Sequence, residues 1–333
     1  MRGALKAAVG RRLLRANGHL RKLIKRPPDD RALTEYGLMR KDNAAADTIY
    51  QPGKFWAEIN ADFTNLIWAG ALNNLRNEYF NRRFSGPDPC SMQVYRSLLR
   101  IYHEHLLRID RAFVSGMSDP QAGGIGDQTS IDGRPVSLDL LQSVEEALTI
   151  REGLKAVDHI GDPLIIVELG AGYGRLAHVC RRLWPSCTYV ILDLPEALIC
   201  AQTWLAQVFP NEVVPYSESR SCDLDRTTLL GKRIWCLGAQ DIERLPDKGI
   251  DVFINIYSFA EMPPTSVQNY YAHLRRITRG IFYTKQRKME TNLVEGTTTS
   301  EDSYPPLPGS RQIVRRTATL YDEMFEALYA VGG

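Results

Sequence analysis

The sequence predicts an α/β fold, a doubly wound, mostly parallel sheet preceded by a helical domain. Two observations carry this prediction. Apolar, strand-like runs alternate with helical patterns between residues 164 and 284, and such alternation places helices on both faces of a parallel sheet. The first of these runs leads into three glycines at alternate positions, Gly170, Gly172 and Gly174, as expected where a buried strand turns into a helix above a ligand.

The spacing of the glycines distinguishes between ligands. Glu168 closes the apolar run that begins at residue 164, and a helical pattern follows at 176–184. A dinucleotide fingerprint, G-x-G-x-x-G, would place its third glycine at position 175, where this chain has an arginine. The pattern here is E-x-G-x-G-x-G instead. Both the arginine and the acid therefore disfavour a nicotinamide dehydrogenase.

The second strand supplies another acid at the same edge of the expected sheet. It spans 188–193 and ends in Asp193, nineteen residues after Gly174. An acid at the tip of the second strand is placed to accept hydrogen bonds from two ribose hydroxyls. Pro195 suits the first position of the helix that follows.

The remaining strands complete the series. A third strand at 234–237 precedes Asp241 and Ile242, and a fourth at 250–256 contains Asn255. A helix at about 265–277 and a fifth strand at 280–284 follow, then a sixth strand at 311–319 and a closing helix at 320–331.

The glycine pattern resembles motif I of the class I S-adenosylmethionine-dependent methyltransferases, which have a Rossmann-like fold. The Asp-Leu-Pro-Glu turn from Asp193, the segment 255–263 and the asparagine-rich segment 70–77 look more narrowly like bacterial sugar O-methyltransferases. Those are relatives of the enzyme that methylates a deoxysugar of nanchangmycin. The likeness covers about residues 55–290. Class I methyltransferases usually finish with an antiparallel strand pair, and the sequence predicts only one of its strands.

The resemblance implies S-adenosylmethionine as the cofactor and gives each candidate residue a role. Glu168 would orient the ammonium group, and backbone N–H groups around Gly172 and Gly174 would favour the methionine carboxylate. Asp193 would hold the ribose, and Asp241 or the backbone of Ile242 would meet the adenine. Asn255 would lie nearest to the sulfonium.

The implied reaction is methyl transfer to a sugar hydroxyl of a polysaccharide or a glycosylated natural product. A hydroxyl needs a general base, which contributes about 10²–10⁴-fold. Glu261, just past the fourth strand, is the candidate base, although a helix cap or a buried structural carboxylate would explain it equally. His103 and His105 are the alternatives if their helix roofs the pocket. Because they are two residues apart on a helix, at most one of them points inward.

Two other functions fit the same sequence. One is methylation of an aromatic or polyketide hydroxyl, and the other is a non-catalytic, methyltransferase-like scaffold. A sugar pocket would present polar and aromatic groups, whereas an aromatic acceptor would favour an apolar cavity lined by Met and Phe. No metal is expected, because the acids between residues 223 and 243 are spaced as in a solvated loop. The polar and aromatic candidates are Asn73, Asn74, Arg76 and Tyr173.

Charge divides the chain into an arm and a body. The formal net charge is +2, but residues 1–26 carry nine Lys or Arg and no acid, so the remainder sums to about −7. Nothing outside the arm suggests nucleic-acid binding. We expect a basic arm at 1–50, a helical cap domain at 51–155 and the cofactor-binding domain at 156–333. The arm is either an amphipathic helix on an anionic membrane surface or a partly ordered leader.

The six cysteines show no zinc-ligand spacing, which favours a reducing cytoplasm. No apolar run approaches the ~18–20 residues that cross a bilayer, and the basic start is a poor secretory signal. Residues 115–136 are expected to form a surface loop. The polar stretch 285–309 is expected to be either a functional lid or a disordered insertion.

Overall fold

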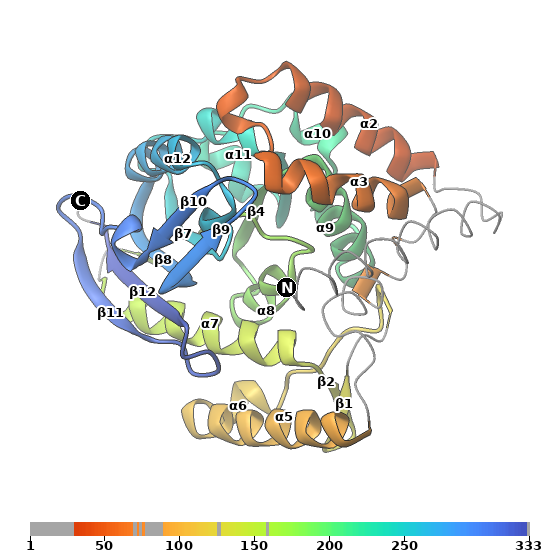
Figure 1. Ribbon diagram of the computed structural model, residues 1–333, viewed down its shortest axis with the longest axis vertical. Helices are drawn as coiled ribbons and strands as arrows, with labels where there is room; N and C mark the ends of the chain where they lie inside the picture. The colour runs from red at the N-terminus through yellow and green to blue at the C-terminus, as the bar shows by residue number, and fades with distance from the viewer. Residues whose placement is uncertain are drawn as a thin grey trace.

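A computed structural model describes residues 30–68, 72, 75–76, 89–124, 128–157 and 160–331. Its centre is an eight-stranded sheet in the order β11-β12-β8-β7-β3-β4-β6-β5 (Figure 1). The strands are β3 (Ile165–Leu169), β4 (Thr188–Asp193), β5 (Val213–Val214), β6 (Ile234–Gly238), β7 (Ile250–Ile256), β8 (Thr278–Arg287), β11 (Arg311–Thr317) and β12 (Met324–Ala330).

The sheet is parallel except for one strand. β3 pairs in parallel with β4 on one side and β7 on the other, and β12 runs antiparallel between β8 and β11. The chain moves outward from β3 through β4 to the edge strand β5, adds β6 between β4 and β5, and then returns to the other side of β3 at β7. Ligands bind at such a reversal of strand order, outside the carboxyl ends of the strands. The predicted doubly wound α/β fold is confirmed.

Helices cover both faces of the sheet, as the near-continuous apolar burial of its central strands requires. On one face α7 packs against α8 and against β8 and β12. The apolar residues of the two faces form two separate cores. The covering helices are α7 (Leu138–Lys155), α8 (Arg175–Leu183), α9 (Pro195–Val208), α10 (Tyr216–Ser219), α11 (Arg226–Leu230) and α12 (Pro264–Ile277), with short 3-10 turns η3 (Ala239–Arg244) and η4 (Phe259–Glu261).

The closing helix predicted at 320–331 is wrong. Residues Met324–Ala330 form β12, which fills the space between β8 and β11 and completes the antiparallel pair that the sequence analysis did not find. Phe325, Ala327 and Tyr329 face one core, while Leu328 faces the other. Helix-forming residues here adopt a strand because two flanking strands provide backbone partners along its whole length.

The N-terminal helical region lies at two ends of the molecule. α2 (Asp30–Ala45), η1 (Thr48–Tyr50) and α3 (Lys54–Trp68) pack at one end of the molecule, and α5 (Pro89–Ile109) and α6 (Arg111–Val114) lie at the other, beyond α7 (Figure 1). The predicted basic segment 1–26 lies outside the described residues. No helix in the described ranges combines the length and apolar character needed to cross a membrane.

Two segments predicted as loops contain strands. The stretch 115–136 includes the hairpin of β1 (Thr129–Ile131) and β2 (Arg134–Val136). The stretch 285–309 begins with the end of β8 and continues into the hairpin of β9 (Met289–Asn292) and β10 (Thr297–Ser300), followed by η5 (Glu301–Ser303). This hairpin lies beside η4, at the edge where the parallel strands end.

Candidate active site

A cavity of about 860 Å³ opens at the carboxyl ends of β3, β4 and β7. The glycine loop forms its floor, and residues 49–53 with the first turn of α3 form part of its roof. Its further walls come from α7, from the end of β8 and from the turn before β12. Segments distant in the sequence therefore meet at the reversal of strand order, where ligands bind in doubly wound sheets.

The glycine loop adopts left-handed backbone that only glycine takes readily. Gly170 has φ +76° and Gly172 has φ +61°. A Cβ on Gly170 would lie 2.4 Å from the Cβ of Ser258, whereas a Cβ on Gly172 would meet nothing within 4 Å. Gly172 lines the cavity, so its bare backbone leaves space for a ligand. Gly174 caps α8 and does not line the cavity.

Two buried carboxylates line the cavity on either side of this loop. The Tyr189 hydroxyl donates to Glu168 Oε2 at 2.6 Å. The backbone N–H groups of Gly172 and Leu194 donate to the two oxygens of Asp193, at 2.9 and 2.7 Å. Burial raises the pKa of each carboxyl to about 7. The two acids face the cavity and are desolvated, so a cationic or hydroxyl-bearing ligand would relieve the cost of their burial.

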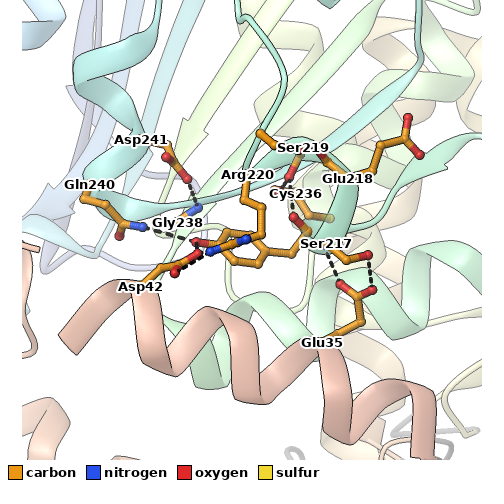
Figure 2. A network of polar contacts seen from close by, with 12 residues as sticks. Glu35, Asp42, Ser217, Glu218, Ser219, Arg220, Cys236, Gly238, Gln240 and Asp241 are labelled. Carbon is orange, nitrogen blue, oxygen red and sulfur yellow. Dashed lines mark hydrogen bonds and ion pairs between the residues drawn. The ribbon is translucent and has the colours of Figure 1, made fainter. Parts of the chain in front are cut away.

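Asp241, one of the two predicted adenine contacts, has partners within the fold. Asp241 is buried and accepts from the backbone N–H of Gly238 at 2.9 Å (Figure 2). It also accepts from Arg244 Nη1 at 2.8 Å. Ile242 is fully buried. Neither lines the cavity, which instead receives Leu194 and Ala239 at this end.

The side chain of Asn255 forms hydrogen bonds within the fold and does not reach the cavity. Its Nδ2 donates to the Leu169 carbonyl at 3.0 Å, and its Oδ1 accepts from Gln286 Nε2 at 2.6 Å. It is fully buried and does not line the cavity. The neighbouring residues Tyr257 and Ser258 do line it.

Glu261 lies where the sequence analysis expects a base. It ends η4, is half-buried and lines the cavity. Its Oε2 accepts from the Trp56 indole N–H at 3.1 Å, so α3 and η4 meet across the cavity. Tyr257, two residues before the start of η4, has φ +61°. This is a strained backbone for a non-glycine residue, and such strain concentrates at functional sites.

The two histidines do not reach this site. His103 and His105 lie on α5, and neither lines the cavity. His103 is buried, while His105 is exposed and stacks on Tyr102. Within the described ranges no histidine lines the cavity at all.

The sequence analysis missed a charged cluster on the α7 side of the cavity. Glu146 on α7 pairs with Arg175 at 2.6 Å and with Lys285 at 3.1 Å, and all three residues line the cavity. Arg175 was used only to exclude a dinucleotide fingerprint. A lysine at the end of an otherwise apolar strand was the signal available for Lys285.

The sequence candidates for sugar recognition are only partly in place. Tyr173 lines the cavity and donates to Asp139 at 2.8 Å. Arg76 is buried in an ion pair with Asp119 and does not line it. Asn73 and Asn74 lie outside the described residues. The part of the chain that the structure describes has no cluster of His, Cys, Asp or Glu able to hold a metal ion.

Comparison with known proteins identifies the same region. The family model described as an O-methyltransferase domain matches residues 122–218, which run from before α7 to α10. Acetylserotonin O-methyltransferase of Macaca mulatta is 35% identical over 77 residues. That match covers 22% of this chain, which thus spans 21% of the length of this curated relative.

Solved structures give only distant likenesses. The pyocyanin biosynthetic protein PhzM is 15% identical, with a TM-score of 0.38, over 58% of this chain and 57% of its own. Magnesium protoporphyrin IX methyltransferase (ChlM) from Synechocystis PCC 6803, with bound SAM, is 13% identical, with a TM-score of 0.41, over 75% of this chain and all (100%) of its own. The fold assignment rests on the strand order and the glycine loop.

The strand order, the glycine loop with its two acids and the O-methyltransferase match together define the class. The fold is that of a class I, S-adenosylmethionine-dependent methyltransferase, and S-adenosylmethionine is the cofactor. The residues present fit this cofactor, since buried acids that line the cavity, Glu168 and Asp193, are available for its ammonium group and its ribose. The individual contacts and the sugar acceptor stay predictions.

Proposed function

We propose that this chain transfers a methyl group from S-adenosylmethionine to a sugar hydroxyl of a polysaccharide or a glycosylated natural product. One observation carries the proposal. A single cavity of about 860 Å³ joins the glycine loop and Asp193 to a wall of carboxylates and aromatic rings. This volume lies in the upper part of the range of about 300–1,000 Å³ for ligand pockets, so an acceptor has room beside the cofactor.

Glu261 is the base in this proposal. S-adenosylmethionine, when bound, supplies an electrophilic methyl group to the acceptor oxygen. The hydroxyl proton must leave as the new C–O bond forms, and a positioned carboxylate can take it. Glu261 lines the cavity with its Oε2 fixed by Trp56. No described histidine lines the cavity, and the base that we assign is therefore this carboxylate.

The lining of the cavity supports a sugar. A sugar ring presents hydroxyl groups at its edge and C–H groups on its faces, which match carboxylate or amide groups and aromatic rings respectively. Both kinds line the cavity away from the glycine loop, namely Gln51, Gln142 and Glu323 among the polar residues and Trp56, Tyr257 and Tyr321 among the aromatic ones.

A second candidate is an aromatic or polyketide hydroxyl. The curated relative over part of this chain is named for O-methylation of acetylserotonin, an aromatic acceptor. Phe55, Met262 and Met324 also line the cavity and would suit a flat apolar ring.

One experiment separates these acceptors. The purified protein is incubated with S-adenosylmethionine labelled in its methyl group and with either a panel of methyl glycosides or acetylserotonin. Label in a glycoside supports the proposal, and label in acetylserotonin alone supports the second candidate. A third outcome is that the protein binds S-adenosylmethionine but transfers no label to a glycoside, to acetylserotonin or to an extracted polysaccharide. In that case both enzymatic functions fail and a scaffold role remains.

The proposal includes a cytoplasmic location. Five of the six cysteines, at positions 180, 187, 200, 222 and 236, are free, which suits a reducing compartment. Peripheral membrane contact through residues 1–26 stays a prediction.

A further inference from the structure

A buried lysine at the edge of the cavity has hydrogen-bonding capacity that the protein does not use. Lys285 is 3% exposed and lines the cavity near the end of β8. Its ammonium group donates to Glu146 Oε1 at 3.1 Å, the one bond that it makes to described residues. An ammonium group has three donors, so two of them are left for a ligand.

Lys285 shares its partner Glu146 with a second cation, Arg175. The same Oε1 also accepts from Arg175 Nη2 at 3.1 Å, and Oε2 accepts from Arg175 Nη1 at 2.6 Å. Two cations therefore share one fully buried carboxylate. Asp139 and Glu168 act on Arg175 as well, whereas the shared Glu146 is the ion-pair partner that the described residues give Lys285. A buried charge without a full partner is costly, and an anion in the cavity would complete the pairing.

The backbone N–H groups of the three glycines in the loop are already occupied. Gly172 N–H donates to Asp193 at 2.9 Å. The N–H groups of Gly170 and Gly174 donate to the carbonyls of Leu192 and Ala171, at 2.9 and 3.0 Å. The three glycine N–H groups are therefore unavailable without rearrangement. The remaining walls nearby are acidic, at Glu168 and Asp139, so Lys285 stands out as a partner for a negative group.

We propose that Lys285 binds a carboxylate inside the cavity and that Glu146 positions its ammonium group. The inference rests on the proposed function, because the cavity then receives two molecules that can bring a carboxylate. One source is the methionine carboxylate of S-adenosylmethionine. The other is an acidic acceptor, such as a uronic acid.

Titration calorimetry of the full chain tests the first source. The ligands are S-adenosylmethionine and 5′-methylthioadenosine, which keeps the nucleoside but lacks the amino acid. Lys285→Met should raise the Kd of S-adenosylmethionine at least tenfold and leave the Kd of 5′-methylthioadenosine within threefold. The second ligand thereby shows that the variant is folded. Lys285→Arg should recover part of the affinity, and Lys288→Met, which removes a lysine bonded to Thr317 outside the cavity, should change neither Kd.

A second arm tests the acceptor source in the presence of S-adenosylhomocysteine. Methyl glucuronide and methyl glucoside differ in carrying a carboxylate or a hydroxymethyl group. Binding of the glucuronide alone to the wild type, lost in Lys285→Met while cofactor affinity is unchanged, would assign the lysine to the acceptor. If Lys285→Met changes neither the cofactor nor the glucuronide titration, the proposal is wrong. If the wild type binds neither nucleoside ligand, it is instead the proposed function that fails.

Discussion

At the scale of single residues, the site is built at the expense of stability. Glu168 and Asp193 are buried at the cavity wall, and burial raises the pKa of each to about 7. A carboxyl whose pKa is higher in the folded than in the unfolded state stabilises the fold at low pH and loses that contribution as pH rises. Near neutral pH both groups are partly ionised, which suits acids that wait for a ligand.

Replacement of Glu168 should therefore flatten the pH dependence of stability. Because the pKa of Glu168 is raised in the folded state, this residue stabilises the fold fully below its pKa in the unfolded chain, near 4. That stabilisation disappears as pH passes about 7. We expect Glu168→Gln to reduce the fall in the free energy of unfolding between pH 5 and pH 8, by up to about 3 kcal/mol. Urea unfolding at the two pH values measures this. Glu104→Gln, at an exposed position on α5, is the control, and an unchanged slope in Glu168→Gln would contradict the account.

The proposed base gives a second prediction at this scale. Glu261→Gln keeps the shape of the side chain and an oxygen for the Trp56 indole N–H, but it removes proton affinity. We expect the Kd of S-adenosylmethionine to stay within threefold. We expect kcat to fall at least tenfold, because a general base typically contributes about 10²–10⁴-fold. Single-turnover kinetics with calorimetry separates the two quantities. Full turnover in the variant would remove Glu261 from its assigned role.

Residue-level prediction from sequence succeeded where geometry is local. Gly170, Gly172, Glu168 and Asp193 follow from the strand-to-helix turn and from strand order, and they line the cavity, whereas Gly174 caps α8. Asp241 and Asn255 were chosen by position along the chain, but their side chains turn to backbone and side-chain partners within the fold. The position of Lys285 against Glu146 depends on the contact of β8 with α7, 139 residues apart, which no local pattern encodes.

At the scale of elements, the N-terminal segment closes the cavity. α2 is fastened to the sheet edge because Asp42 accepts from Arg220 at 2.6 and 2.7 Å and Glu35 accepts from the backbone N–H of Ser217 at 2.9 Å (Figure 2). This attachment brings η1 and the start of α3 over the cavity, where Tyr50 and Trp56 line it. The roof of the site therefore precedes the cofactor-binding strands in sequence by about a hundred residues.

The hairpin of β9 and β10 holds the same roof from the other side. Glu295, in its turn, accepts from the backbone N–H of Phe55 in the first turn of α3 at 2.8 Å, and a negative group is favourable at a helix N-terminus. We expect Glu295→Ala to loosen the roof and to speed dissociation of S-adenosylmethionine about three- to tenfold in stopped-flow measurements. Thr298→Ala, an exposed change in the same hairpin, should have no effect. Equal dissociation rates for Glu295→Ala and the wild type would show that this contact does not retain the cofactor.

Element types could be predicted wherever apolar periodicity and turn residues agree, as in β3, β4, β6, β7 and β8. The two-residue edge strand β5 was not predicted. They could not at the C-terminus, where the residues of β12 are good helix formers. There the backbone partners on β8 and β11 decide the structure. The sequence likewise predicts a polar loop where the hairpin of β9 and β10 lies, because the alternation of apolar and polar residues is weak and the strands are short.

At the scale of the whole molecule, segments from the N-terminal and C-terminal parts of the described chain line one cavity. The glycine loop and the two acids come from the sheet, whereas the roof comes from the N-terminal helices and the far wall from β8 and the turn before β12. Doubly wound sheets bind ligands where the strand order reverses, and here the surrounding elements enclose that point. We therefore expect the site to need the described N-terminal region as well as the sheet.

The most direct test is calorimetric titration of the full chain with S-adenosylmethionine and, separately, with NADH, repeated on Asp193→Ala. Asp193 lines the cavity at the tip of β4, where loss of its carboxylate should weaken cofactor binding at least tenfold. Asp302→Ala, at an exposed position, is the control. We predict that the chain binds S-adenosylmethionine with micromolar affinity and does not bind NADH. The affinity for S-adenosylmethionine should be weakened in Asp193→Ala and unchanged in Asp302→Ala. Binding of NADH, or S-adenosylmethionine affinity that survives loss of Asp193, would contradict it.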